Sequence, residues 1–296
     1  MRSIFYMICA SASFAGNDIC NKVAVQYLPV PEILTIRGIF ASIFAFALVC
    51  AVHGARTLPT ITNRYVVIRS IIESLVGPVL ITAYFFLPVA TVTSIMQFGP
   101  FVGMIVGVWL FREQVGWRRW LAAIAAFCGV MLIIKPGGAG FQPVAFIVLI
   151  ATLLTVLRDM QSRKIGASAP PFVVSLATSL VGIVIALILA PLMRPFAIGP
   201  WGEWVWPAAY PLAVTIASSA FLVSAHAFAF LAFRSGDMAV VSPFRYFNLL
   251  FAVIGGIFVF AEWPDRISIL GMLLVVTAGI YLLHRERTRA KKPAAT

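Results

Sequence analysis

Charged residues are scarce in this chain. Of its 296 residues, 11% are charged and 61% are hydrophobic, and the mean hydropathy is +1.01. Soluble domains carry about 25% charged residues, so this composition excludes a soluble globular protein. Apolar runs of about 18 or more residues recur along the chain, and each is long enough to cross a bilayer as a helix. The sequence therefore predicts an all-α integral membrane protein.

Signatures of enzymes and channels are also missing. The chain contains no HExxH, GxSxG, GxxxxGK[ST] or TVGYG segment, which are the patterns of several enzyme classes and of potassium-channel filters. Its cysteines have no CxxC spacing, and no His, Cys and carboxylate cluster has metal-ligand spacing. We therefore expect no enzyme, no cofactor and no metal site. A channel or an intramembrane enzyme stays the alternative of another class.

Basic residues are distributed unevenly along the loops. The apolar runs predict ten transmembrane helices, which leave 15 Lys and Arg residues on one side of the membrane and four on the other. Because cytoplasmic loops are enriched in these residues, we expect a multi-pass protein of the inner (cytoplasmic) membrane with both termini in the cytoplasm. The same distribution explains the formal charge of +12 without a nucleic-acid partner. Membrane lipids and a small-molecule substrate are the expected partners, and either a monomer or a homodimer is compatible with the sequence.

One stretch of the chain occurs twice. Residues 90–113 (ATVTSIMQFGPFVGMIVGVWLFRE) return at 239–262 (AVVSPFRYFNLLFAVIGGIFVFAE). The chain is thus divided into a first repeat of five helices, residues 1–137, and a second repeat of five helices with a short basic cytoplasmic tail, residues 138–296. Because five is odd, the second repeat enters the membrane upside down relative to the first. Inverted repeats of this kind are typical of secondary transporters.

Both repeats carry the same pattern around their fourth helix. An alanine precedes it, a glutamate ends it and a glycine-bearing helix follows; these residues are Ala90, Glu113 and Gly129, then Ala239, Glu262 and Gly279. The second repeat also has SPFRY at 242–246, whereas the first has Ser94 in place of Pro243 and its proline at Pro100. With ten helices in two halves, the chain resembles the drug/metabolite transporter superfamily, specifically its EamA-type members.

The resemblance implies a secondary transporter of small organic metabolites that works by alternating access. Similar proteins export amino acids, including aromatic ones, and other metabolites. We therefore expect export of amino acids or related compounds, with proton coupling as an option. Uptake of a metabolite or vitamin is the alternative within the transporter class.

Polar residues inside membrane helices are costly and are candidates for function. Arg245 and Asn248 share a face of the predicted ninth helix beside Tyr246, and Gln97 holds the position of Tyr246 in the fourth helix. We expect these four residues to bind a substrate that carries a carboxylate. The alternative is that Arg245 extends to the interface while the two amides bond neighbouring helices. Arg37 is expected to extend outward or, alternatively, to meet a substrate carboxylate.

Two further residues are candidates for transport. His226 lies in the predicted eighth helix, where it either contacts substrate, relays protons or bonds a neighbouring helix. Glu73 is the proton-coupling candidate if it is unpaired, but Arg69 stands four residues before it, and a pair between them would be structural. Asp18 is expected to pair with Lys22 in the same way.

Glycines at four-residue spacing mark one face of the fourth helix. Gly99, Gly103 and Gly107 form this face, and Gly256 is the counterpart of Gly107 in the ninth helix. Small residues at such spacing let membrane helices approach closely. We expect these four glycines to serve helix packing.

Overall fold

The computed structural model describes residues 2–112, 115–137, 142–165, 168–193, 195, 199–235 and 241–290. Every regular element within these residues is helical. The α-helices are α1 (Arg2–Ala24), α2 (Val30–Leu48), α3 (Arg64–Phe86), α4 (Val89–Met96), α5 (Gly99–Phe111), α6 (Trp117–Ile134), α7 (Ala145–Ile165), α8 (Pro171–Met193), α9 (Ala209–Ser235), α11 (Phe247–Phe260) and α12 (Arg266–Ala290). A π-helical turn (Val49–His53) and two 3-10 helices, η2 (Ala55–Thr62) and η4 (Ser242–Tyr246), complete the described elements.

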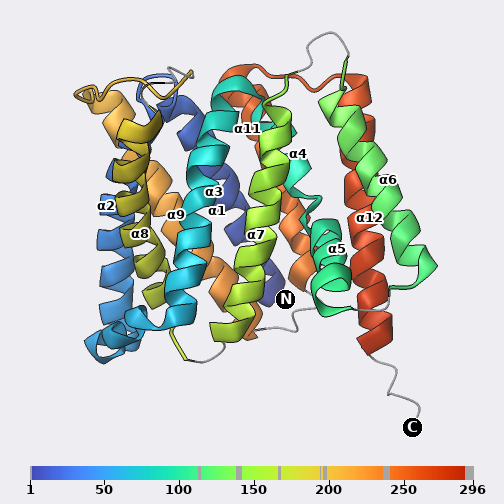
Figure 1. Cartoon of the computed structure of the whole chain (residues 1–296), viewed down its shortest axis with the longest axis horizontal. Coiled ribbons are helices and arrows are strands. Elements are labelled where there is room, and N and C mark those ends of the chain that lie inside the picture. Colours follow the sequence, from blue (N-terminus) through green and yellow to red (C-terminus); the bar gives the residue numbers. More distant parts are fainter. Residues whose placement is uncertain are drawn as a thin grey trace.

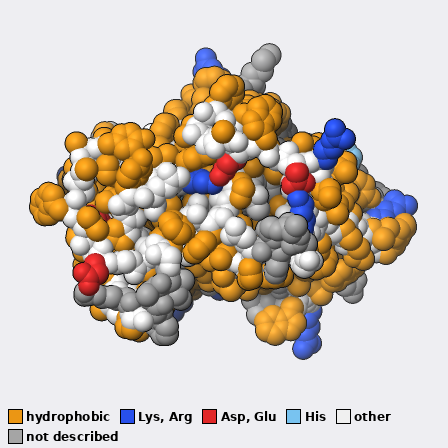
Figure 2. Space-filling model, turned by 90° about the horizontal axis from the view of Figure 1, so that it is seen from above, with side chains coloured by type: hydrophobic (Ala, Val, Ile, Leu, Met, Phe, Trp, Pro, Cys, Tyr) orange, Lys and Arg blue, Asp and Glu red, His pale blue; other side chains and the backbone are white. Residues whose placement is uncertain are grey.

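Within the described residues, eight helical segments are long and apolar enough to cross a membrane. Large apolar side chains such as those of Trp109 and Phe258, both 83% exposed, point outward from the bundle, where lipid tails accept them. Figure 2 shows hydrophobic side chains around much of the perimeter of one end of the molecule. The prediction of an all-α membrane protein is confirmed. The eight segments are Val30–His53, Arg64–Phe86, Val89–Trp109, Trp117–Ile134, Ala145–Ser162, Pro171–Met193, Ala209–Ala232 and Pro243–Phe260.

Helices of the first and second halves of the chain pack against each other. The largest contacts join α1 to α9, α2 to α8, α3 to α7 and α6 to α12. In Figure 1, α2, α8 and α9 form one edge of the bundle, α6 and α12 form the opposite edge, and the remaining helices lie between them. The start of α1 and the end of α12 lie at the same end of the bundle (Figure 1). The two halves are therefore interleaved and do not form separate bodies.

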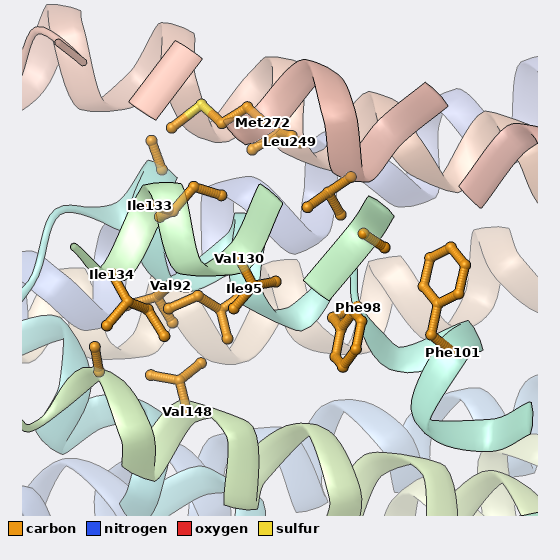
Figure 3. Packing of buried hydrophobic residues seen from close by; sticks show 14 of the residues in the cluster. Val92, Ile95, Phe98, Phe101, Val130, Ile133, Ile134, Val148, Leu249 and Met272 are labelled. Atoms are coloured by element: carbon orange, nitrogen blue, oxygen red, sulfur yellow. The ribbon is translucent and has the colours of Figure 1, made fainter. Parts of the chain in front are cut away.

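The largest apolar cluster fills the space between α4, α6, α7, α11 and α12. Figure 3 shows side chains of this cluster, including Val92 and Ile95 from α4 and Val130 from α6. Two glycines bring α6 and α12 together, since a Cβ on Gly129 would lie 2.8 Å from the carbonyl oxygen of Gly271. The two helices thus touch through their backbones, as small residues permit in membrane helices.

The fourth membrane segment is broken in its middle. Its first half, α4, ends at Met96, and α5 begins at Gly99. Pro100 lacks the N–H that would bond the Met96 carbonyl in a continuous helix, which explains the break. The matching segment of the second half begins as the 3-10 turn η4, which passes into α11 after Tyr246, the residue aligned with Gln97.

Candidate functional site, a polar cavity inside the bundle

A cavity of ≈ 390 Å³ lies among nine helical elements, namely α1, α2, α3, α4, α7, α8, α9, η4 and α11. Its volume falls within the range of small-molecule sites, which is about 300–1,000 Å³. Charged side chains inside a membrane bundle are costly and mark functional sites by default. The charged residues that line this cavity are Asp18, Arg37, Arg69, Glu73, Arg158, Asp159 and Arg245.

Four of these residues form an ion-pair network between α3 and α7. The Glu73 carboxylate lies 2.6 Å from Arg158 Nη1 and 3.6 Å from Arg69 Nη2. Arg158 also pairs with Asp159 at 2.7 Å. The alternative in which Arg69 pairs with Glu73 is therefore confirmed. Glu73 was a proton-coupling candidate only if its carboxylate was unpaired. In this structure the carboxylate is paired, so that condition is not met.

Two cavity arginines have a different environment. Within the described residues, neither Arg37 nor Arg245 forms an ion pair. Arg37 does not extend outward, because its Nη2 lies 3.0 Å from the point that a Cβ on Gly77 of α3 would occupy; the first expectation for this residue is wrong. Arg37 lies near Asp18 and Glu73, and Arg245 lies near Asp159, but neither arginine is in direct contact with these carboxylates. Both guanidinium groups can therefore accept a carboxylate ligand through charge-assisted hydrogen bonds.

Asp18 lies on the wall of the cavity formed by α1. Its carboxylate accepts a hydrogen bond from Asn17 Nδ2 at 3.1 Å and faces the Tyr84 hydroxyl. The expected pair with Lys22 is wrong, because Lys22 donates to the Leu87 carbonyl at 2.9 Å and pairs with Glu262. The cause is that Leu87 follows the end of α3, where carbonyls have no helical partner. Among the described residues, Asp18 therefore has no ion pair.

His226 joins two walls of the cavity. Its Nδ1 lies 3.2 Å from Ser175 Oγ of α8, and its ring meets Phe14 of α1 edge-on with centroids 5.7 Å apart. The alternative in which His226 bonds a neighbouring helix is confirmed. The ring also lines the cavity, so a contact with substrate stays a prediction.

Gln97, Arg245 and Asn248, predicted from the sequence to bind substrate, all line the cavity. Buried atoms of Gln97 and Asn248 have no hydrogen-bond partner among the described residues, so these amides do not bond neighbouring helices as the alternative required. Tyr246 is not among the lining residues. Its hydroxyl oxygen occupies the space beside Gly279 of α12, 1.7 Å from where a Cβ would stand.

The glycines predicted for helix packing have ordinary contacts. A Cβ on Gly99 or Gly103 would lie 3.8 or 3.7 Å from side chains of α7, and Gly107 is buried. A Cβ on Gly256 would lie 3.8 Å from Glu262 Oε2, whereas one on Gly255 would lie 2.1 Å from Ile19 Cδ1 of α1. The closest helix approach thus falls one residue before Gly256.

Sequence reasoning missed Arg158 and Asp159 as cavity residues. It counted Arg158 among the basic residues of the cytoplasmic side, but α7 continues to Ile165 and places this side chain in the bundle at 15% exposure. One signal was available, because Asp159 is the repeat counterpart of Asp18. Glu113 and Ala239, which belong to the repeated pattern, lie outside the described residues.

Comparison with known proteins places this site in a transporter. Residues 1–135 match the EamA-like transporter family. An S-adenosylmethionine uptake transporter of Rickettsia felis is 23% identical over 97% of this chain and 94% of its own length. A riboflavin transporter of Rhizobium johnstonii is 26% identical over 70% of this chain and 66% of its own length. A pseudopaline exporter of Pseudomonas aeruginosa is 20% identical over 96% of both chains.

The apolar helices and the polar cavity define a multi-pass membrane transporter. The first half of the chain thus carries an EamA-like transporter domain, and the chain as a whole is similar to transporters of small metabolites. The family and these relatives are transporters and not enzymes. A solved crystal structure with 14% identity superimposes with a TM-score of 0.64 over 96% of this chain and 98% of that one, which shows a shared fold.

Proposed function

We propose that this protein is a secondary transporter that carries amino acids or related compounds through the central cavity by alternating access. The observation that carries the proposal is the cavity itself, in which Arg37 and Arg245 have no ion pair among the described residues. A substrate carboxylate binds such guanidinium groups through charge-assisted hydrogen bonds. Gln97, His226 and Asn248 complete the proposed site. Tyr246 lies outside the cavity lining and packs with its hydroxyl beside Gly279 of α12.

An α-amino group of the same substrate has a partner as well. The Asp18 carboxylate lines the same cavity as both arginines, and an ammonium group is the complement of an unpaired carboxylate. The wall around the site thus offers opposite charges for the two ends of an amino-acid group. S-adenosylmethionine, the substrate named for one relative, contains such a group.

The direction that we propose is export, as for the pseudopaline exporter. Uptake is the second candidate, because relatives that cover nearly the whole chain are named for S-adenosylmethionine uptake. Both directions use the same site and the same alternation of access. Only the gradient and the coupling decide between them.

We propose ten membrane helices in two inverted repeats, residues 1–137 and 138–296. The helix contacts support this arrangement. If each helix of one repeat is exchanged for its counterpart in the other repeat, these contacts are converted into other contacts that the structure also has. The contact of α1 with α9 matches that of α7 with α3, and the contact of α2 with α9 matches that of α8 with α3. Ten crossings also agree with the shared location of the start of α1 and the end of α12 (Figure 1). We place both ends in the cytoplasm and the protein in the inner membrane.

Proton coupling requires a carboxylate that gains and loses a proton during the cycle. Glu73 is the candidate from the sequence, but Arg158 and Arg69 both stabilise its charged form. Asp18 has hydrogen-bond donors beside it and Arg37 nearby, but it forms no ion pair among the described residues. We therefore propose Asp18 as the first candidate and Glu73 as the second.

A binding screen tests the proposed substrate class. Ligands that bind only the folded protein raise its melting temperature, so the purified protein is heated with amino acids, sugars, organic acids and simple amines. Stabilisation by compounds that carry both an α-ammonium and an α-carboxylate group is the expected result. Stabilisation by sugars or amines alone would contradict the proposed role of the arginines.

A further inference from the structure

Four buried polar atoms beside the helix break have no partner among the described residues. They are Thr93 Oγ1, Gln97 Nε2, Thr155 Oγ1 and Asn248 Oδ1. All four residues line the cavity, and we name this group the polar wall. Because a buried polar atom without a hydrogen bond is unfavourable, these atoms are suited to a ligand that supplies the missing partners.

The two threonines of the polar wall differ from other threonines in the bundle. A helical threonine usually satisfies its hydroxyl by donating to the carbonyl four residues earlier. Thr93 and Thr155 make no such bond. The described threonines that do make it, with oxygen–oxygen distances of 2.7–2.9 Å, are Thr35, Thr82, Thr152, Thr178, Thr215 and Thr277.

Three helices bring the polar wall together. Thr93 and Gln97 are four residues apart and share a face of α4, which contacts both α7, with Thr155, and α11, with Asn248. The opposite face of α4 carries Val92 and Ile95, which point into the apolar cluster (Figure 3). The break after Met96 places the Gln97 amide at the end of α4, inside the bundle. The same helix thus separates an apolar core from a hydrogen-bonding surface.

We propose that the polar wall binds an uncharged nitrogen heterocycle of the transported substrate. Gln97 Nε2 can only donate and Asn248 Oδ1 can only accept, whereas the two hydroxyls can do either. A carboxylate only accepts and an ammonium only donates, so neither matches this set. A ring edge with adjacent donor and acceptor atoms, as in adenine, matches it. Phe14 and Met96 line the same cavity and offer contacts for the faces of the ring.

This inference rests on the proposed transport function and specifies its substrate class. The polar wall and the charged part of the cavity would hold different parts of one molecule, a heterocycle and an amino-acid group. Thr93 and Thr155 would then decide specificity, since they lie on the polar wall and carry no charge.

Threonine-to-valine variants test the inference, because valine keeps the shape and removes the hydroxyl. We expect T93V and T155V each to weaken binding of adenosine or riboflavin by about three- to tenfold, the effect of one neutral hydrogen bond. Their melting temperatures without ligand should stay unchanged or rise, since the hydroxyls that they remove have no partner. Binding of L-methionine, which lacks the ring, should stay unchanged.

T152V is the matched control. Thr152 lies one turn from Thr155 on α7, but its hydroxyl is already satisfied, since it donates to the Val148 carbonyl at 2.8 Å and lies 3.3 Å from Met96 Sδ. This variant should leave adenosine and riboflavin binding unchanged. The inference is overturned if neither probe binds the wild-type protein, or if T93V and T155V bind both probes as tightly as T152V does. If L-methionine binds and exchanges across the membrane while the heterocycles do not bind, the inference fails and the proposed transport function stands.

Discussion

At the scale of single residues, the function depends on which charges inside the bundle are paired. Arg69 and Arg158 are held by Glu73 and Asp159, so they build the wall of the cavity. Arg245 lines the same cavity without an ion pair among the described residues. The distinction between structural and substrate-binding cations therefore follows from neighbours in space and not from depth in the membrane alone.

Replacing Arg245 by alanine should weaken binding of an amino-acid substrate by tenfold or more, because a hydrogen bond to a charged group contributes about 1.5–3 kcal/mol. The melting temperature without ligand should change little, since no ion pair is lost. Arg56→Ala, in the exposed 3-10 helix η2, is the control with the same change of charge. Tight binding by the Arg245 variant would remove this residue from the site.

The two cavity carboxylates should respond differently to removal of their charge. Asp18→Asn should abolish the pH dependence of transport, since the amide mimics a permanently protonated carboxyl group. Glu73→Gln should instead lower the melting temperature, because it removes the ion-pair partner of Arg69 and one of the two partners of Arg158. Since Arg158 keeps Asp159, the loss should stay below the roughly 3 kcal/mol expected for a buried charge with no partner. The comparison uses transport rates between pH 5 and 8 and thermal unfolding of both variants. An Asp18 variant with unchanged pH dependence contradicts its role in coupling.

The sequence could predict part of this site. Gln97, Arg245 and Asn248 were found because polar residues in apolar helices are rare and stand out. Arg158 and the actual partner of Lys22 could not be found in this way. Whether Arg158 faces the cavity depends on where α7 ends and on its rotation, and Lys22 meets Glu262, which is far away along the chain.

At the scale of helices, backbone contact fixes the pair α6 and α12. Gly271→Ala places a methyl group 2.6 Å from the Gly129 carbonyl oxygen, so the helices must separate. We expect a loss of about 1–3 kcal/mol of stability, as for other overpacked sites. Gly116→Ala is the control, because no atom of the described residues outside its chain neighbours lies within 4 Å of its Cβ position. Equal melting temperatures of the two variants would contradict the close approach.

The start of α12 should make stability depend on pH. The hydrogen bond from Lys135 and those from the Ser268 backbone hold the pKa of Asp265 below its ordinary value of 3.8. A carboxyl group whose pKa is lowered by folding stabilises the protein above that ordinary value and loses its effect as the pH falls below it. The stabilisation should be less than about 1 kcal/mol, because the pair is exposed.

Asp265→Asn separates this charge from helix capping. Asp265 Oδ1 accepts from the Ile267 and Ser268 amides at 3.0 and 3.1 Å, which an asparagine oxygen also does. The variant should therefore unfold at a temperature that changes less between pH 6 and pH 3 than that of the wild type. An identical pH dependence in both proteins would show that the Lys135 bridge has no effect.

The break in the fourth membrane segment shows what a sequence pattern cannot specify. Pro100 indicates that the helix is interrupted, since proline cannot bond the Met96 carbonyl. It does not indicate that the interruption turns Gln97 toward the cavity while Phe98 and Phe101 join the apolar cluster (Figure 3). That division depends on the helices that surround α4.

At the scale of the whole molecule, two halves of the transporter are interleaved around one polar cavity. The repeated segment in the sequence predicted two related halves. It could not predict that helices of one half pack mainly against helices of the other, as α2 does against α8 and α9. Lys22 and Glu262 tie the end of α1 to the end of α11, so they hold the bundle together at that end.

Counterflow in proteoliposomes distinguishes a carrier that works by alternating access from a channel. Vesicles that contain the purified protein are loaded with an unlabelled amino-acid compound that raises its melting temperature, and a trace of labelled compound is added outside. Alternating access predicts a transient accumulation of label above its equilibrium level, and this overshoot should be absent with Arg245→Ala. A wild-type protein that lets the label only equilibrate, with no overshoot, would contradict the account and indicate a channel.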